Sequence, residues 1–247
     1  MTFAAIALAP LAQGDFFTER GPGSEASCVA ENETVCWGWA FDNADRWVTP
    51  TLDHLLLVAL SVAFGFVMAL AMGILSHRRR WLIPAFTGAS GVLYTIPSIA
   101  LFLLLLPISG RGNVTAVIAL TLYTLQIIYR NIVTGLANVP EAARDSGRGM
   151  GMTERQLLWR VELPLAVPEI IAGLRIATVS TVAIATLAVF AGGGGLGEEI
   201  YRAIQQGAFK TGIIVPSLIA IAMAIAFDMV HVGTQRALSP WRRVRPM

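Results

Sequence analysis

Five long apolar segments constrain this chain more than any other feature. They lie at about residues 52–75, 82–107, 114–133, 165–191 and 212–230. Each is close to the ~20 residues that an α-helix needs to cross a hydrocarbon core of ~30 Å. Because only helices satisfy their own backbone hydrogen bonds in lipid at such lengths, we expect an all-α polytopic membrane protein with five core helices. The composition agrees, since 55% of the 247 residues are hydrophobic and 14% are charged.

The first 50 residues differ in composition from the rest of the chain. The apolar run at 3–12 is too short to cross a core of ~30 Å, and no basic residue precedes it. We therefore expect it to lie on the membrane surface and not to be a signal peptide. Cys28 and Cys36, the only cysteines, favour a disulfide outside the cytoplasm over a metal site, which would need further ligands. Three tryptophans favour an edge against the lipid headgroups: Trp37, Trp39 and Trp47.

Basic residues are distributed unevenly between the two sides of the five segments. With the N-terminus outside, the outer side holds Arg20, Arg46, Arg111, Arg202 and Lys210. The inner side holds Arg78, Arg79, Arg80, Arg130, Arg144, Arg148, Arg155, Arg160, Arg236, Arg242, Arg243 and Arg245. Inner connections carry an excess of Lys and Arg, so we expect residues 1–50 outside the plasma (inner) membrane and the tail at 236–247 in the cytoplasm.

The longest polar connection between two apolar segments runs from residue 138 to 164. Its sequence predicts two short helices separated by a break. Asn138 would cap the first helix, with Glu141 three residues further on, and Thr153 and Gln156 would form a capping box on the second. Between them, three glycines would permit a sharp turn, and Pro164 would close the segment; the glycines are Gly147, Gly149 and Gly151.

This connection resembles the cytoplasmic EAA loop of type I ABC importer permeases. Their pattern is Glu-Ala-Ala, a glycine six residues after the glutamate, and Leu-Pro twelve residues after that glycine. A literal Glu-Ala-Ala begins at Glu141, but Leu163 and Pro164 then fall four residues too late. A start at Asp145 places Gly151, Leu163 and Pro164 at the family spacing, so we prefer this register although Asp-Ser-Gly replaces Glu-Ala-Ala.

The preferred register leads to different expectations for two glycines. A bulky residue at Gly151 should uncouple ATP hydrolysis from uptake. Gly147, the glycine of the rejected register, should tolerate replacement better. The literal Glu-Ala-Ala at Glu141 would extend the first helix by one turn.

The resemblance implies a type I ABC importer transmembrane fold over residues 51–235, with the loop at 138–164 docking on a cytoplasmic ATPase. It also implies two ATPase copies, a second permease subunit (identical or paralogous), an extracytoplasmic binding protein and surrounding lipid, but no nucleic acid. ATP and Mg would bind the ATPase, so this chain would have no catalytic site and no cofactor. The sequence agrees, since it has no GxxxxGK[ST] motif and Lys210 is its only lysine. GGGGLG at 192–197 resembles the GAGGLG of these permeases.

Three stretches indicate the transported solute: GRGMGM, LLWRVELPLAVP and AGLRIAT most resemble the osmoprotectant branch, which handles glycine betaine, choline and carnitine. A quaternary ammonium donates no hydrogen bonds and is held by aromatic faces, each worth ~0.5–2 kcal/mol. Aromatic residues that would line a path, or merely pack, are Tyr94, Tyr123, Tyr129, Phe102 and Phe190. Pro97 would bend the second span beside Tyr94.

Ionisable residues within spans separate classes of transporter, because ion-coupled carriers place them near mid-membrane. Asp228, His231 and Arg130 fall near the inner ends of their spans, and Arg175 lies clearly inside one. Arg175 has three open interpretations: it snorkels inward, pairs with Asp228 or lines an inner gate. The lack of a buried carboxylate pair favours an external energy source. The alternatives are import of another small polar solute such as an amino acid, an ATP-independent secondary carrier, and a membrane-anchored assembly protein.

Overall fold

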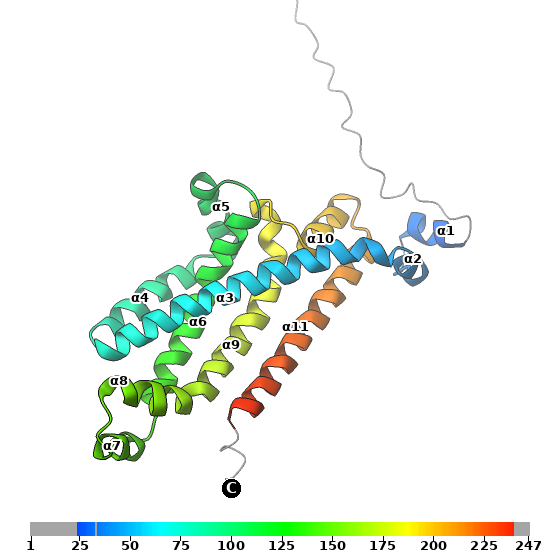
Figure 1. The fold of residues 1–247 in the computed structure, drawn as a ribbon. Coiled ribbons are helices and arrows are strands. Elements are labelled where there is room, and N and C mark those ends of the chain that lie inside the picture. Colours follow the sequence, from blue (N-terminus) through cyan, green and yellow to red (C-terminus); the bar gives the residue numbers. More distant parts are fainter. Residues whose placement is uncertain (1–23, 33, 240–247) are drawn as a thin grey trace, which may run out of the picture.

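A computed structural model describes residues 24–32 and 34–239, and within these ranges the secondary structure is entirely helical (Figure 1). Four helices are long and apolar enough to cross a membrane. They are α3 (Val48–Arg78), α6 (Asn113–Ala137), α9 (Leu163–Ala185) with its flanking turns, and α11 (Lys210–Leu238). The predicted all-α membrane fold is therefore confirmed for the described part of the chain.

The second predicted span is broken, not merely bent. It consists of α4 (Leu82–Thr95) and α5 (Ser98–Ser109), whose axes differ by 99°. Between them Ile96 adopts an extended conformation with φ −67° and ψ 127°. A residue before proline is pushed out of the helical region, and Pro97 has no N–H to continue a helix. The pair makes the fifth membrane segment if both halves count as one span.

The central helix is α6, the most buried of the four long helices. It packs against α3 on one side and α9 on the other, and α11 packs against α9. Close approach requires small residues: a Cβ on Gly65 of α3 would lie 1.9 Å from Thr124 Oγ1, and one on Gly173 of α9 would lie 2.5 Å from Asn131 Cβ. These contacts set the spacing of the three helices.

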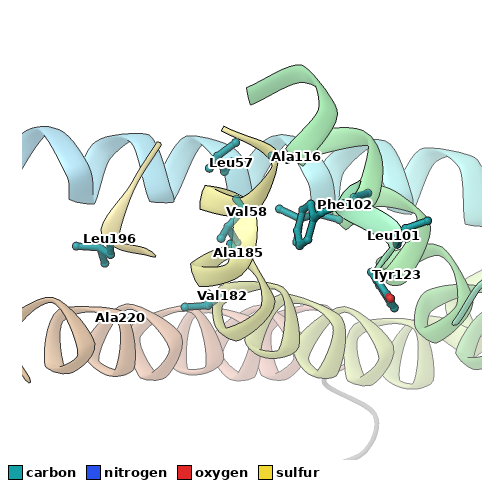
Figure 2. Close-up of a cluster of buried hydrophobic side chains, with 14 residues drawn as sticks. Leu57, Val58, Leu101, Phe102, Ala116, Tyr123, Val182, Ala185, Leu196 and Ala220 are labelled. Carbon is teal, nitrogen blue, oxygen red and sulfur yellow. The ribbon is translucent and has the colours of Figure 1, made fainter. Parts of the chain in front are cut away.

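Two buried apolar clusters fill the helical body. Figure 2 shows the first, which gathers side chains from α3, α5, α6, α9 and the elements after it, including Leu57, Phe102, Ala185 and Leu196. The second cluster lies toward the 138–164 connection and includes Tyr129, Ile132, Leu158 and Ala166. The two clusters give the fold a continuous core along α6.

The glycine run at 192–195 ends the helical segment that begins with α9. The helix tightens into η3 (Thr186–Ala191) and stops at Gly192, whose φ of +77° favours glycine. A short helix follows as α10 (Leu196–Gln205). Its buried residues are Leu196, Gly197, Glu199 and Ala203, whereas Ile204 is exposed.

The N-terminal helices α1 (Ser24–Glu31) and α2 (Trp37–Asp42), with the 3-10 turn η1 (Ala44–Trp47), form a small cap on α11. Cys28 and Cys36 are disulfide-bonded. The predicted headgroup edge is wrong for two tryptophans, because Trp39 and Trp47 are buried in a cluster with Phe209. Trp37 alone of the three is exposed. The apolar run at 3–12 lies outside the described residues.

Candidate functional site

The 138–164 connection forms a helical hairpin at the end of the molecule opposite α5 and α10 (Figure 1). Its first arm is α7 (Glu141–Gly149), and its second begins with α8 (Glu154–Leu157). The predicted capping box is present: the Thr153 N–H donates to Gln156 Oε1 at 2.9 Å, and the Gln156 N–H donates to Thr153 Oγ1 at 3.3 Å. Asn138 does not cap α7, because it ends α6 and Pro140 precedes α7.

The second arm is not the separate short helix that we expected. α8 continues through the π-helical segment η2 (Leu158–Glu162) into α9, so Pro164 lies at the start of a long helix and does not close the loop. The Leu163 N–H donates to the Leu158 carbonyl, five residues earlier. In a regular helix the ring of Pro164 would clash with the carbonyl four residues earlier, and the wider turn accommodates it.

A buried carboxylate joins the hairpin to the long helices. Glu162 is only 3% exposed and receives Arg144 Nε at 2.8 Å and His77 Nε2 at 2.8 Å. The second guanidinium nitrogen of Arg144 donates to the Leu136 carbonyl at 2.7 Å. These bonds connect α7 with the C-terminal ends of α3 and α6 and with the start of α9. We name Glu162, Arg144 and His77 the anchor cluster.

The outer side of α7 is charged and exposed. Glu141 accepts from Arg144 at 3.1 Å and from Arg148 at 3.4 Å. The hydrogen bond from Arg144, followed by its charge and that of Arg148, lowers the pKa of Glu141 below its ordinary value. Asp145 lies 3.7 Å from Arg148, and Met150 is 69% exposed at the tip of the hairpin. This face offers both charges and one large apolar side chain to a partner.

The two glycines that define the competing registers have different surroundings. Gly151 lies in the turn with φ +75° and open space around its Cα. Gly147 is buried, and a Cβ there would lie 2.5 Å from Leu157 Cδ1. A side chain at Gly147 would have to displace the end of Leu157, and which of the two glycines tolerates replacement better stays a prediction.

The predicted path aromatics do not form one site. Tyr94 is 45% exposed and stacks edge-on against Tyr123, whose hydroxyl donates to the Ile96 carbonyl at the α4–α5 break. Pro97 directly precedes α5. Two others are buried within this chain, Phe102 and Tyr129, and the last, Phe190, packs against Tyr201.

Arg175 pairs with Asp228, which is one of its three predicted interpretations. Its guanidinium donates to the two carboxylate oxygens at 2.8 and 2.9 Å, linking α9 to α11. Asp228 lies ten residues before Leu238, the end of α11, or ~15 Å along a helix. It is therefore deeper than expected, and the side chains of both partners are about one-third exposed.

Two buried polar residues were not predicted from the sequence, Glu162 in the hairpin and His54 in α3. In the sequence Glu162 is one of several acids in a charged loop; Arg144 lies 18 positions before it, and His77 belongs to a different helix. His54 in α3 is fully buried and donates from Nε2 to the Val182 carbonyl of α9 at 3.1 Å. Within the described ranges, no group of His, Cys, Asp and Glu is arranged to hold a metal.

The helical body, the glycine run after α9 and the hairpin at 138–164 are the features of a transport permease. Residues 61–244 match the binding-protein-dependent transport system inner membrane component family, and the chain belongs to this family. It is a multi-pass inner-membrane protein, and permease subunits of this kind are not the catalytic part of their transporters.

Two relatives are named for related solutes. The chain is 37% identical over 207 residues to the osmoprotectant import permease protein OsmW of Salmonella typhimurium, which covers 82% of this chain and 96% of that protein. It is 35% identical over 200 residues to the glycine betaine/carnitine/choline transport system permease protein OpuCB of Bacillus subtilis, covering 80% and 91%.

Solved transporters share the fold. A chain of the inward-facing MetNI methionine ABC transporter superposes with a TM-score of 0.71 at 24% identity, over 78% of this chain and 95% of that chain. A chain of an amino acid ABC transporter crystallised with histidines gives 0.69 at 18% identity, over 83% and 99%. These likenesses confirm the type I importer fold.

Proposed function

We propose that this chain is the permease subunit of an ATP-driven importer for a small osmoprotectant such as glycine betaine, choline or carnitine. The two relatives described above, named for such solutes, support the solute class. The anchor cluster is the observation that carries the ATP-driven part of the proposal. It gives the hairpin a fixed, charged attachment to α3, α6 and α9.

The exposed face of α7 receives the ATPase. Glu141, Asp145 and Met150 present charge and apolar surface at the hairpin tip. Arg144, whose side chain is only 14% exposed, is held by three acceptors, on Glu141, Glu162 and Leu136. When the ATPases close, a push on α7 therefore passes into the long helices and switches the path from inward-open to outward-open.

The rest of the assembly follows from this docking. Residues 1–50 lie outside, the transmembrane domain spans 51–235, and the loop at 138–164 and tail at 236–247 lie in the cytoplasm. Two permease subunits, identical or paralogous, form the pathway and bind two ATPases, which hold ATP and Mg. A binding protein delivers the solute to the outer face, and this chain binds no cofactor.

Two features suit the transport path. Tyr94 presents an accessible aromatic ring beside the α4–α5 break, and an aromatic face contributes ~0.5–2 kcal/mol to holding a quaternary ammonium. The Arg175–Asp228 pair lies inside two apolar spans with both side chains partly exposed. Charges at such a depth face a bundle interior or water, because facing lipid is costly. We assign this pair to the side of α9 and α11 that borders the pathway.

The test is reconstitution of the permease with its ATPase and binding protein in proteoliposomes. We expect ATP-dependent uptake of radiolabelled glycine betaine that stops when ATP or the binding protein is omitted. Uptake that requires a sodium or proton gradient and no ATP would contradict the proposal. ATP-dependent uptake of an amino acid in place of glycine betaine would overturn the solute class alone.

A further inference from the structure

We propose that the basic cleft between the hairpin and the inner end of α3 binds the phosphate of an anionic lipid headgroup. The cleft has a volume of about 630 Å³. Its lining comes from α3 and the turn after it, from α7, and from the second arm of the hairpin. The lining residues with acidic or basic side chains are His77, Arg78, Arg80, Glu141, Arg144, Arg148, Glu154, Arg155 and Glu162.

The negative charges of this cleft are already engaged. Glu162 is bound by Arg144 and His77. Glu141 pairs with Arg144 and Arg148, and Glu154 lies 3.6 Å from Arg148. The carboxylates therefore leave no free partner for further cations.

Three arginines of the cleft have no such partner. Arg78, Arg80 and Arg155 make no ion pair or side-chain hydrogen bond within residues 24–32 and 34–239. They belong to separate segments, the inner end of α3, the turn after it and α8, and all line one cleft. A guanidinium binds phosphate oxygens through a planar fork of N–H donors, so one phosphate would offset the mutual repulsion of these charges.

The position of the cleft relative to the membrane surface favours a lipid as the source of the phosphate. Trp81 follows Arg80 directly and is 68% exposed, and the apolar helix α4 begins at the next residue. Trp159 on η2, next to the cleft residue Leu158, is 52% exposed. Exposed tryptophans concentrate at the headgroup level of membranes. The orientation in the proposed function places this level in the cytoplasmic leaflet, where anionic lipids gather near basic clusters.

The inference rests on the proposed orientation, and its test uses the complete transporter with its ATPase. Phosphatidylglycerol is titrated into the purified complex in phosphatidylcholine nanodiscs, and bound lipid is counted by native mass spectrometry. Arg80→Gln with Arg155→Gln should weaken phosphatidylglycerol binding about thirty-fold, taking the usual contribution of each arginine near a charged surface. Arg79→Gln is the matched control, because Arg79 is exposed in the same turn but does not line the cleft.

The possible outcomes distinguish a lipid phosphate from a soluble phosphate. Loss of lipid in the double variant, with retention in Arg79→Gln, supports the lipid site. Displacement of the lipid by excess inorganic phosphate would keep the phosphate site and assign it to a soluble anion. Equal lipid binding by all three proteins, or binding that the permease shows alone and loses when the ATPase docks, would overturn the inference. ATP-dependent uptake by the unmodified complex is measured in parallel, so failure of the lipid site is distinguishable from failure of the proposed function.

Discussion

Arg144 Nε lies 2.8 Å from Glu162 Oε1, although the two residues belong to opposite arms of the inner hairpin. The pair fastens α7 to the wide turn that precedes Pro164. His77 of α3 contacts the same carboxylate through Nε2. The hairpin is therefore a rigid extension of the transmembrane helices, and a force applied to α7 has a direct route into them.

Removing the charge of Glu162 should loosen this attachment. We expect Glu162→Gln to destabilise the hairpin by ~1–3 kcal/mol, because a buried guanidinium loses its charged acceptor. Solute moved per ATP hydrolysed should fall while the ATPase remains bound. Glu154→Gln is the control, since its side chain is 80% exposed, and it should change neither quantity appreciably. An unchanged ratio of solute to ATP in Glu162→Gln would contradict the role of the anchor cluster.

Substitutions at the two glycines of the hairpin should lower its stability for different reasons. Gly147→Leu should cost ~1–3 kcal/mol, because it overpacks against the buried Leu157. Gly151→Ala meets no neighbouring atom but holds φ at +75°, which costs ~1–2 kcal/mol for a residue with a Cβ. Thermal unfolding of both variants measures the loss of stability. Full stability of Gly147→Leu would show that the hairpin arms pack differently.

Glu141 should stay ionised at pH values somewhat below the ordinary pKa of a glutamate side chain. Arg144, and to a lesser degree Arg148, lowers the pKa of Glu141 in the folded hairpin. The pair therefore contributes stability that is fully present above the ordinary glutamate pKa and is lost as the pH falls through the lower folded value. Melting temperatures measured between pH 7 and pH 3 (roughly the range in which glutamates titrate) should show a small drop for the native chain.

The control for this titration is Glu141→Gln. Its melting temperature should lack the Glu141 component of the drop at low pH. Identical pH profiles for the variant and the native chain would show that the Glu141 pairs do not stabilise the hairpin.

The Arg175–Asp228 pair should behave as a unit. Either Arg175→Gln or Asp228→Asn leaves one charge inside an apolar span without its hydrogen-bonded partner, so each single variant should be less stable than the native chain. The double variant removes both charges and should recover much of the lost stability and uptake. A double variant that is as impaired as the sum of the two singles would show that the residues act independently.

The disulfide should stabilise the N-terminal cap without affecting the hairpin at 138–164. Cys28→Ser should lower stability by ~2–3 kcal/mol through the entropy of the opened loop, and it should change mobility on nonreducing gels. The cap holds α11 through the Cys36 N–H bond to Thr211 Oγ1 at 2.9 Å. ATPase binding should remain at the native level, and a loss of binding would show that the two ends are coupled.

Local sequence signals predicted the elements of this fold well. Apolar length identified the spans, and Thr153 and Gln156 predicted a cap that is present. These features depend on neighbouring residues alone, so the sequence contains all that is needed to recognise them.

Features that depend on tertiary contact were not predicted. His77 and Glu162 are separated by 85 positions in the sequence and meet only because α3 and the hairpin pack together (162 − 77 = 85). The burial of Trp39 and Trp47 needs Phe209 from the other end of the chain. The break at Ile96 was expected as a bend, because proline chemistry indicates a bend but not its angle. Glu162 was missed for the same reason, since nothing local distinguishes it from the exposed acids of the loop.

Purification of the chain from its native membrane in mild detergent, with ATPase activity and partner masses measured on the same sample, tests whether an ATPase drives this permease. We expect an ATPase that co-purifies with the native chain and is lost when the exposed face of α7 is altered by Asp145→Arg and Met150→Arg. A chain that purifies without any ATPase, and still moves solute across vesicle membranes, would contradict the importer function and support a secondary carrier.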